Sequence, residues 1–160
     1  MKGGMDGDLR RIRGVADYQF GPGVGAALFP EGVTIEYSRN TGRIRHIYIG
    51  DVLLASFRPT DGLFTLTMAG AERLMAGLDA PRFTVTVTDE AAEFVAQARN
   101  VFAKHVVDAG DTIRPGDEVV VLDGGRGVLA VGRALLNGEE MLAFRSGVAV
   151  KVRRGRGRHR

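Results

Sequence analysis

Apolar residues in the first half of the chain recur at intervals that predict helices and short strands. Leu9, Ile12 and Ala16 are spaced to share one face of a helix, which a segment rich in glycine and proline would end. Alternation of apolar and polar residues favours strands at residues 33–37, 44–49 and 52–57. A second helix is predicted at residues 69–78, with Thr67 in position to cap it. This half therefore predicts a small α/β domain over residues 1–79.

The second half predicts a different architecture, beginning after a boundary near Pro81. Residues 83–88 alternate strictly, and Asp89 is in position to cap a helix at residues 90–99. Further strands are expected at residues 101–107, 118–122, 128–136 and 149–153, and a short helix at residues 138–144. Glycine-containing turns separate these segments. The order predicts a mostly antiparallel β pseudo-barrel with two short helices over residues 80–154, so the whole chain is expected to be α+β.

Length and composition exclude several classes of protein. A chain of 160 residues is too short for a complete (β/α)₈ barrel, which takes about 250 residues. The absence of cysteine excludes a disulfide framework, a thiolate metal site and a cysteine nucleophile. No run of roughly 18 apolar residues could span a membrane, and the first residues lack the apolar stretch of a signal peptide. We therefore expect a cytoplasmic protein without a membrane partner.

The positive charge is concentrated at the end of the chain. Residues 151–160 contain six basic residues and no acidic one, so the other 150 residues carry a formal net charge of −3 against +3 for the whole chain. Residues 155–160 are expected to form a disordered basic tail. Such a tail is typical either of a nucleic-acid-binding arm or of a solubilising end, and composition does not decide between them.

Four segments of the second half resemble the PUA domain in sequence and in order. They are residues 100–106, 113–119 with the motif R-P-G-D-E-V, 129–134 with A-V-G-R-A, and 140–153 with the ending A-V-K-V-R. The first half is similar to the domain that precedes PUA, through residues 16–21, 38–45 and 57–64. Both domains together resemble the C-terminal end of archaeal archaeosine tRNA-guanine transglycosylases and archaeosine synthases. Residues 97–99, Gln-Ala-Arg, depart from the family pattern, which predicts a glycine there.

The resemblance implies RNA binding without catalysis. In those enzymes the catalytic part is a (β/α)₈ barrel with an aspartate nucleophile and a cysteine-rich zinc site, for which this sequence has neither the length nor the cysteines. The resemblance therefore implies a non-catalytic module that binds tRNA, at its acceptor stem and 3′ end, either alone or beside a separate transglycosylase or archaeosine synthase chain. An RNA-binding factor of ribosome assembly or translation is the alternative. A small enzyme would need a clustered acid–base set, which the sequence does not show.

Basic residues of the barrel are the candidate RNA contacts. They are Lys104, His105, Arg133, Arg145, Lys151 and Arg153. Lysine and arginine suit this role because they neutralise phosphates and release counterions. Lys151 and Arg153 are expected to share a strand face, because they are alternate residues. Each of these side chains could equally belong to a solvated surface that binds nothing.

Three further observations complete the sequence-based expectations. Arg39, Arg43 and Arg45 form a second basic cluster beside a predicted turn, which would either extend the RNA surface or remain solvated. Phe102 is expected to share a strand face with Lys104 and to lie in the core, although it could also stack on a base. The three histidines have no partner ligands at useful spacing, so neither a metal nor another cofactor is expected.

Overall fold

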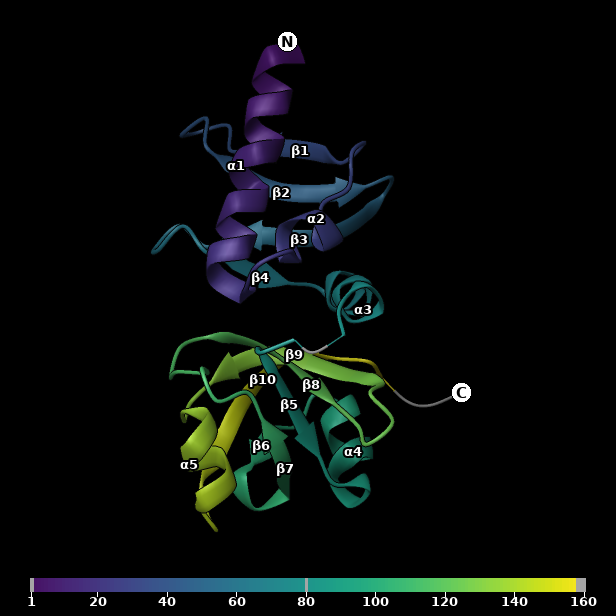
Figure 1. Ribbon diagram of the computed structural model, residues 1–160, viewed down its shortest axis with the longest axis vertical. Coiled ribbons are helices and arrows are strands. Elements are labelled where there is room, and N and C mark those ends of the chain that lie inside the picture. The colour runs from purple at the N-terminus through teal and green to yellow at the C-terminus, as the bar shows by residue number, and fades with distance from the viewer. Residues whose placement is uncertain (1, 80, 158–160) are drawn as a thin grey trace. The chain divides into compact units, whose positions relative to one another are not determined.

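The chain forms two compact units, Met1–Asp79 and Ala80–Arg160, which are described separately. The structure is a computed structural model that describes residues 2–79 and 81–157, and Figure 1 labels its helices and strands. Within the described residues, no helix is both long enough and apolar enough to cross a membrane.

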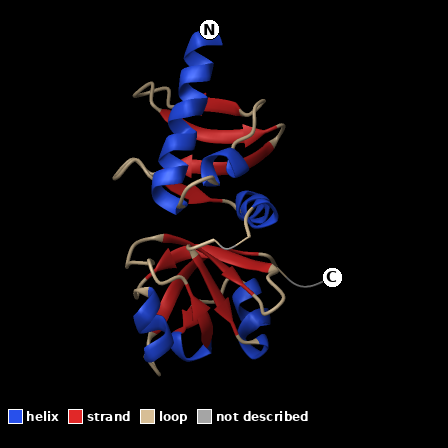
Figure 2. Cartoon of the chain, viewed as in Figure 1, coloured by secondary structure: helices blue, strands red, loops and turns tan. Residues whose placement is uncertain are grey.

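The first unit is a four-stranded antiparallel sheet with helices packed against it (Figures 1 and 2). The strands lie in sequence order and are β1 (Thr34–Tyr37), β2 (Ile44–Ile49), β3 (Val52–Phe57) and β4 (Phe64–Leu66). The helices are α1 (Lys2–Phe20), α2 (Val24–Leu28) and α3 (Met68–Gly77). The predicted strands and the second predicted helix are present, and the Thr67 side chain accepts a hydrogen bond from Gly70 N at 3.0 Å, which confirms the predicted cap.

Aromatic rings and the inner face of α1 form the core of the first unit. The ring of Phe64 stacks on Phe57 with centroids 4.1 Å apart and lies against Phe29 at 5.1 Å. Ile12 and Ala16 are completely buried, as the periodicity of the helix predicts. The opposite face of α1 is consequently exposed.

The second unit is a six-stranded sheet that curls into a barrel. Its strand order is β6-β10-β9-β8-β5-β7, and its one parallel pair joins β5 to β8. The strands are β5 (Thr84–Val87), β6 (Val101–Phe102), β7 (Val106–Ala109), β8 (Glu118–Leu122), β9 (Val128–Ala134) and β10 (Val148–Gly155); the helices are α4 (Asp89–Ala96) and α5 (Gly138–Ala143). A mostly antiparallel barrel with two short α-helices was expected from the sequence, and the α+β class is confirmed.

The predicted continuous strand at residues 101–107 is wrong. A 3₁₀ helix, Ala103–His105, separates β6 from β7. β6 pairs with β10 at one edge of the sheet, whereas β7 pairs with β5 at the other edge. The chain must cross between the two edges within three residues, and a tight helical turn makes that crossing possible. This turn closes the barrel.

Two other local predictions are corrected by the structure. Thr88, not Asp89, caps α4, because its side chain accepts a hydrogen bond from Ala91 N at 3.3 Å. The expected disorder from residue 155 is also wrong for the described residues: Gly155 ends β10, and the amides of Arg156 and Gly157 donate to Leu129 O and Ala96 O at 2.8 and 2.7 Å. Residues 158–160 of the predicted tail lie outside the described residues.

The glycine of the A-V-G-R-A motif has a packing role. A Cβ atom placed on Gly132 would lie 2.3 Å from the backbone oxygen of Lys151, so only glycine lets β9 and β10 approach this closely. Gly132 pairs with Val152, and the register shifts between Val152 and Arg154. The β-bulge at Arg153 therefore lies directly after the close approach.

Candidate nucleic-acid interface

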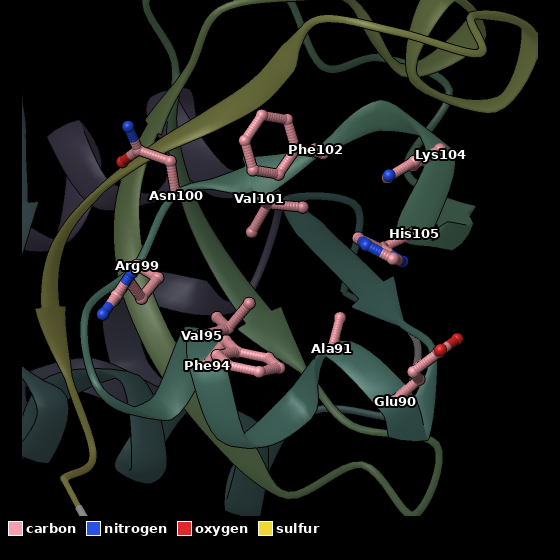
Figure 3. Close-up of a pocket in the computed structure, with 10 residues that line it drawn as sticks. All are labelled: Glu90, Ala91, Phe94, Val95, Arg99, Asn100, Val101, Phe102, Lys104 and His105. Atoms are coloured by element: carbon pink, nitrogen blue, oxygen red, sulfur yellow. The ribbon is translucent and has the colours of Figure 1, made fainter.

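A pocket of about 380 Å³ lies between α4 and the segment that contains β6 and the 3₁₀ helix (Figure 3). α4 and the turn after it supply one side, and residues 100–105 supply the other. The residues that line it are Glu90, Ala91, Phe94, Val95, Arg99, Asn100, Val101, Phe102, Lys104 and His105. All of them come from one continuous stretch of 16 residues in the second unit.

Two exposed phenylalanine rings stand on opposite sides of this pocket (Figure 3). Phe94 is 61% exposed and Phe102 is 47% exposed, so the expected core position of Phe102 is wrong. β6 is only two residues long, and its alternation turns Val101 into the core and Phe102 outward. Exposed aromatic rings of this kind offer a flat apolar surface on which another ring can stack.

The turn at the end of α4 fixes one end of the pocket. Ala98 has a φ of 69°, the left-handed conformation that glycine usually supplies after a helix. Its amide donates to Val95 O at 2.9 Å, and the amide of Arg99 donates to Phe94 O at 3.1 Å. Although this segment lacks the glycine of the family pattern, its backbone adopts the conformation that glycine would supply. The hydrogen bonds of the turn also hold Arg99 close to Phe94.

Hydrogen bonds also tie the pocket to the barrel. The Asn100 side-chain oxygen accepts from the amide of Val152 on β10 at 3.0 Å, and the His105 carbonyl accepts from the amide of Thr88 at 2.9 Å. Lys104 is exposed and His105 is partly buried, and both line the pocket from the 3₁₀ helix. The strand alternation that was expected to align Phe102 with Lys104 does not apply, because Lys104 lies in that helix.

The charges around the pocket favour an anionic ligand. Arg99 and Lys104 line it together with the partly buried His105, and Glu90 is the single acidic residue among its lining. A planar ring can stack on the two aromatic side chains, and the cations beside them can bind a phosphate that the ring carries.

The basic residues of β9 and β10 are placed in two different ways. Lys151 on β10 pairs in register with Arg133 on β9, and both side chains are exposed. Arg153 instead forms an ion pair with Glu118, whose side chain is completely buried, and its Nη1 donates to Oε1 at 2.9 Å. The bulge interrupts the alternation after Val152, so the shared face expected for Lys151 and Arg153 does not follow from strand periodicity. The charge of Arg153 is compensated inside the protein.

Arg145 lies apart from the pocket lining. α5 ends at Ala143, so Arg145 lies exposed between that helix and β10. The structure thus brings Lys104 and His105 into the pocket and places Arg133 beside Lys151. It puts Arg145 in neither group.

The second predicted cluster lies on the turn between β1 and β2. The turn is closed by hydrogen bonds from Ser38 N to Arg43 O and from Gly42 N to Ser38 O, both 2.8 Å long. Arg39, Arg43 and Arg45 are all exposed, and among the described residues none of their side chains has a hydrogen-bond or ion-pair partner. We call these three residues the arginine hairpin.

A hydrogen bond anchors the base of the arginine hairpin. The hydroxyl of Tyr37, the last residue of β1, donates to the carboxylate of Asp8 on α1. This bond raises the pKa of Tyr37, with smaller contributions from desolvation and from the negative charge of Asp8. The end of β1, which leads into the turn, is therefore tied to α1 at neutral pH.

Two residues of the pocket were missed by sequence reasoning. Phe94 lies on the exposed side of the amphipathic helix α4, and nothing in the sequence distinguishes it from any other surface residue. Arg99 belongs to the segment in which the family pattern predicts a glycine. The departure from that pattern was the one feature of the sequence that marked this turn. As for metals, no group of three or more possible ligands comes together in the part of the chain that the structure describes.

Comparisons with protein families assign both halves of the chain. Residues 10–81 match the patch-forming domain C2 of tRNA-guanine transglycosylase, and residues 83–156 match the PUA domain. The resemblance derived from the sequence motifs is therefore confirmed. The pocket lies entirely within the PUA match.

Whole-chain relatives are longer proteins. The chain is 49% identical over 148 residues to the tRNA-guanine(15) transglycosylase of Methanothermobacter thermautotrophicus, and 48% identical over 150 residues to that of Thermococcus kodakarensis. These matches cover 92% and 93% of this chain but only 23% and 26% of the relatives.

Solved structures have a similar fold over most of the chain. A hypothetical protein from Pyrococcus horikoshii superimposes with a TM-score of 0.74 at 25% identity, covering 92% of this chain and 89% of that one. A PUA domain protein from Thermoplasma acidophilum gives a TM-score of 0.66 at 21% identity, with coverages of 94% and 89%. The second likeness supports the fold alone.

Proposed function

We propose that this chain, in which a patch-forming domain C2 of the tRNA-guanine transglycosylase type precedes a PUA domain, binds tRNA for archaeosine modification. The pocket between Phe94 and Phe102 is the observation that carries the proposal. Its exposed rings and flanking cations have the chemistry that a nucleotide requires. The relatives named above are tRNA-guanine(15) transglycosylases, which supports tRNA as the RNA.

In this proposal, an unpaired nucleotide at the 3′ end of the tRNA occupies the pocket. Its base stacks on Phe94 and Phe102, and Lys104 and Arg99 bind the adjacent phosphates, with His105 beside them. Proteins recognise RNA sequence mainly through such splayed, unstacked bases, because the major groove of an A-form stem is too deep and narrow for side chains to read. Arg133 and Lys151 would contact the backbone of the acceptor stem.

The role we propose is binding rather than catalysis. Glu90 is the single carboxylate among the pocket residues, so the pocket lacks the pair of acid–base groups or the activated nucleophile that base exchange needs. We propose that a separate transglycosylase or archaeosine synthase chain carries the chemistry. Co-production with such a chain should yield a complex, or should raise the affinity of that chain for tRNA.

The test is binding of a full-length tRNA transcript across a salt series. Replacement of Lys104 and Lys151 by alanine should lower the slope of log affinity against log salt by about 1.4, because each lost phosphate contact accounts for roughly 0.7. A chain shortened after Gly157 should retain most of the affinity. If only the shortened chain loses affinity and any polyanion competes equally, the proposal fails. Preferential capture of ribosomal RNA would instead favour a factor of ribosome assembly or translation.

A further inference from the structure

The exposed face of α1 carries basic and aromatic side chains that the fold does not use. Because Ile12 and Ala16 face the core, residues 11, 14 and 18 lie on the opposite side of the helix. Tyr18 is 84% exposed, the largest value among the large apolar side chains that the structure describes as exposed. Arg10 and Arg11 are exposed and have no hydrogen-bond or ion-pair partner among the described residues.

The acidic residues of α1 with described side chains are, in contrast, occupied. Asp8 accepts the hydrogen bond from Tyr37, and Asp17 Oδ1 accepts from the amide of Gly25 at 2.7 Å. Arg13 is occupied as well, because its Nε donates to Phe29 O at 2.8 Å. Among the residues of this helix with described side chains, Arg10 and Arg11 are therefore the basic residues without a hydrogen-bond or ion-pair partner.

The contact between Asp8 and Tyr37 connects this face to the arginine hairpin. Arg11 follows Asp8 by three residues, so the two lie on neighbouring positions of the helix surface. Tyr37 directly precedes the turn that carries Arg39 and Arg43. Arg11 consequently lies on the flank of α1 that is tied, through Asp8, to the end of the strand from which the hairpin begins.

Gly14 leaves the middle of this face open. A Cβ atom at Gly14 would meet nothing within 4 Å, so packing within the protein does not require glycine here. A glycine inside an exposed helix costs about 1 kcal/mol relative to alanine. Because Gly14 has no side chain, the helix backbone between Arg10, Arg11 and Tyr18 is uncovered.

We propose that Arg10, Arg11, Gly14 and Tyr18, which we call the α1 surface, bind the sugar–phosphate backbone of an RNA stem together with the arginine hairpin. Planar guanidinium groups donate paired hydrogen bonds to phosphate, and a tyrosine ring packs against ribose. The open position at Gly14 lets the backbone come close to the helix. The inference rests on the proposed RNA-binding function and adds a contact site in the first unit.

Substitution at Gly14 tests the inference without threatening the fold. Gly14→Glu and Gly14→Gln both fill open space and both raise helix propensity, but only glutamate repels phosphate and pairs with Arg10 one turn away. Ala76→Glu, on the exposed side of α3, adds the same charge elsewhere in the unit. The parent protein and these three variants would be compared for affinity to a full-length tRNA transcript at 0.1 M salt. The comparison would then be repeated with Phe102→Ala added to each of the four proteins.

Gly14→Glu should bind about tenfold more weakly than Gly14→Gln in both backgrounds, the equivalent of one charge-assisted contact, because the two side chains fill the same space and differ in charge. Ala76→Glu should bind as the parent does. Equal affinities of Gly14→Glu and Gly14→Gln, or an equal loss from Ala76→Glu, would overturn the inference. If Phe102→Ala weakens binding and Gly14→Glu does not, the inference fails and the proposed function stands. If the parent protein does not bind tRNA, both fail.

Discussion

The pocket of the second unit and the arginine hairpin of the first are both basic, but they present their charges differently. The pocket is concave, two aromatic rings form part of its lining, and hydrogen bonds at Asn100 and His105 fix its walls to the barrel. The hairpin is a tight turn whose exposed arginines have no hydrogen-bond or ion-pair partner within the described part of the chain. A basic cluster alone attracts RNA without selecting a nucleotide, whereas a basic cluster with a stacking pocket can select an unpaired nucleotide.

The largest expected effect concerns a basic residue that belongs to neither region. Arg153→Gln would break the ion pair between Arg153 and the buried carboxylate of Glu118, so we expect the free energy of unfolding to fall by about 3 kcal/mol. The salt slope of tRNA binding should stay unchanged, because the charge of Arg153 is already compensated. Chemical denaturation and the salt series measure the two quantities. A lower slope with unchanged stability would place Arg153 among the RNA contacts after all.

The next effect separates stacking from charge. Replacing both Phe94 and Phe102 by alanine should weaken tRNA binding by about 1–3 kcal/mol, or roughly fivefold to 150-fold, with an unchanged salt slope. Both rings are exposed, so stability should change little. Phe144→Ala is the matched control, because Phe144 is 44% exposed and does not line the pocket. An equal loss of tRNA affinity in Phe144→Ala would contradict the stacking role of the pocket, and with it the distinction between the pocket and the arginine hairpin.

A smaller effect is expected in the hairpin. Arg43→Gln should lower the salt slope by 0.7–0.9 and reduce affinity several-fold at low salt, with little change at high salt. The loss should be the same for tRNA with and without its unpaired 3′ nucleotides. A loss that appears only with the intact 3′ end would show that the hairpin selects nucleotides as the pocket does.

The smallest effect concerns the turn that holds Arg99. Ala98→Gly should raise the free energy of unfolding by about 0.5–1 kcal/mol, because glycine adopts a φ of 69° without the strain that alanine carries. Affinity for tRNA should not change, since the turn is already formed. Thermal or chemical denaturation would detect the gain, and a destabilised variant would contradict the assigned backbone conformation.

Periodicity predicted most elements but not the crossing that builds the pocket. Residues 101–107 are mostly apolar and resemble one strand, because the sequence does not reveal that β6 and β7 pair at opposite edges of the sheet. Because of this error, Phe102 was expected in the core and the pocket was not predicted. Lys104 and His105 were identified from composition and resemblance, whereas Phe94 and Arg99 become recognisable only once the turn at Ala98 brings them to the same place. Similarly, the pairing of Arg153 with Glu118 depends on a bulge that strand alternation does not predict.

The most direct test of the central claim compares two RNAs. One is a full-length tRNA transcript, and the other is the same transcript without its unpaired 3′ nucleotides; each is titrated with the parent protein and with the Phe94→Ala/Phe102→Ala variant. We expect the parent protein to bind the shortened RNA at least about tenfold more weakly, because the stacked base is lost, and the variant to bind both RNAs equally. Equal affinity of the parent protein for the two RNAs would contradict the assignment of the pocket to the 3′ end.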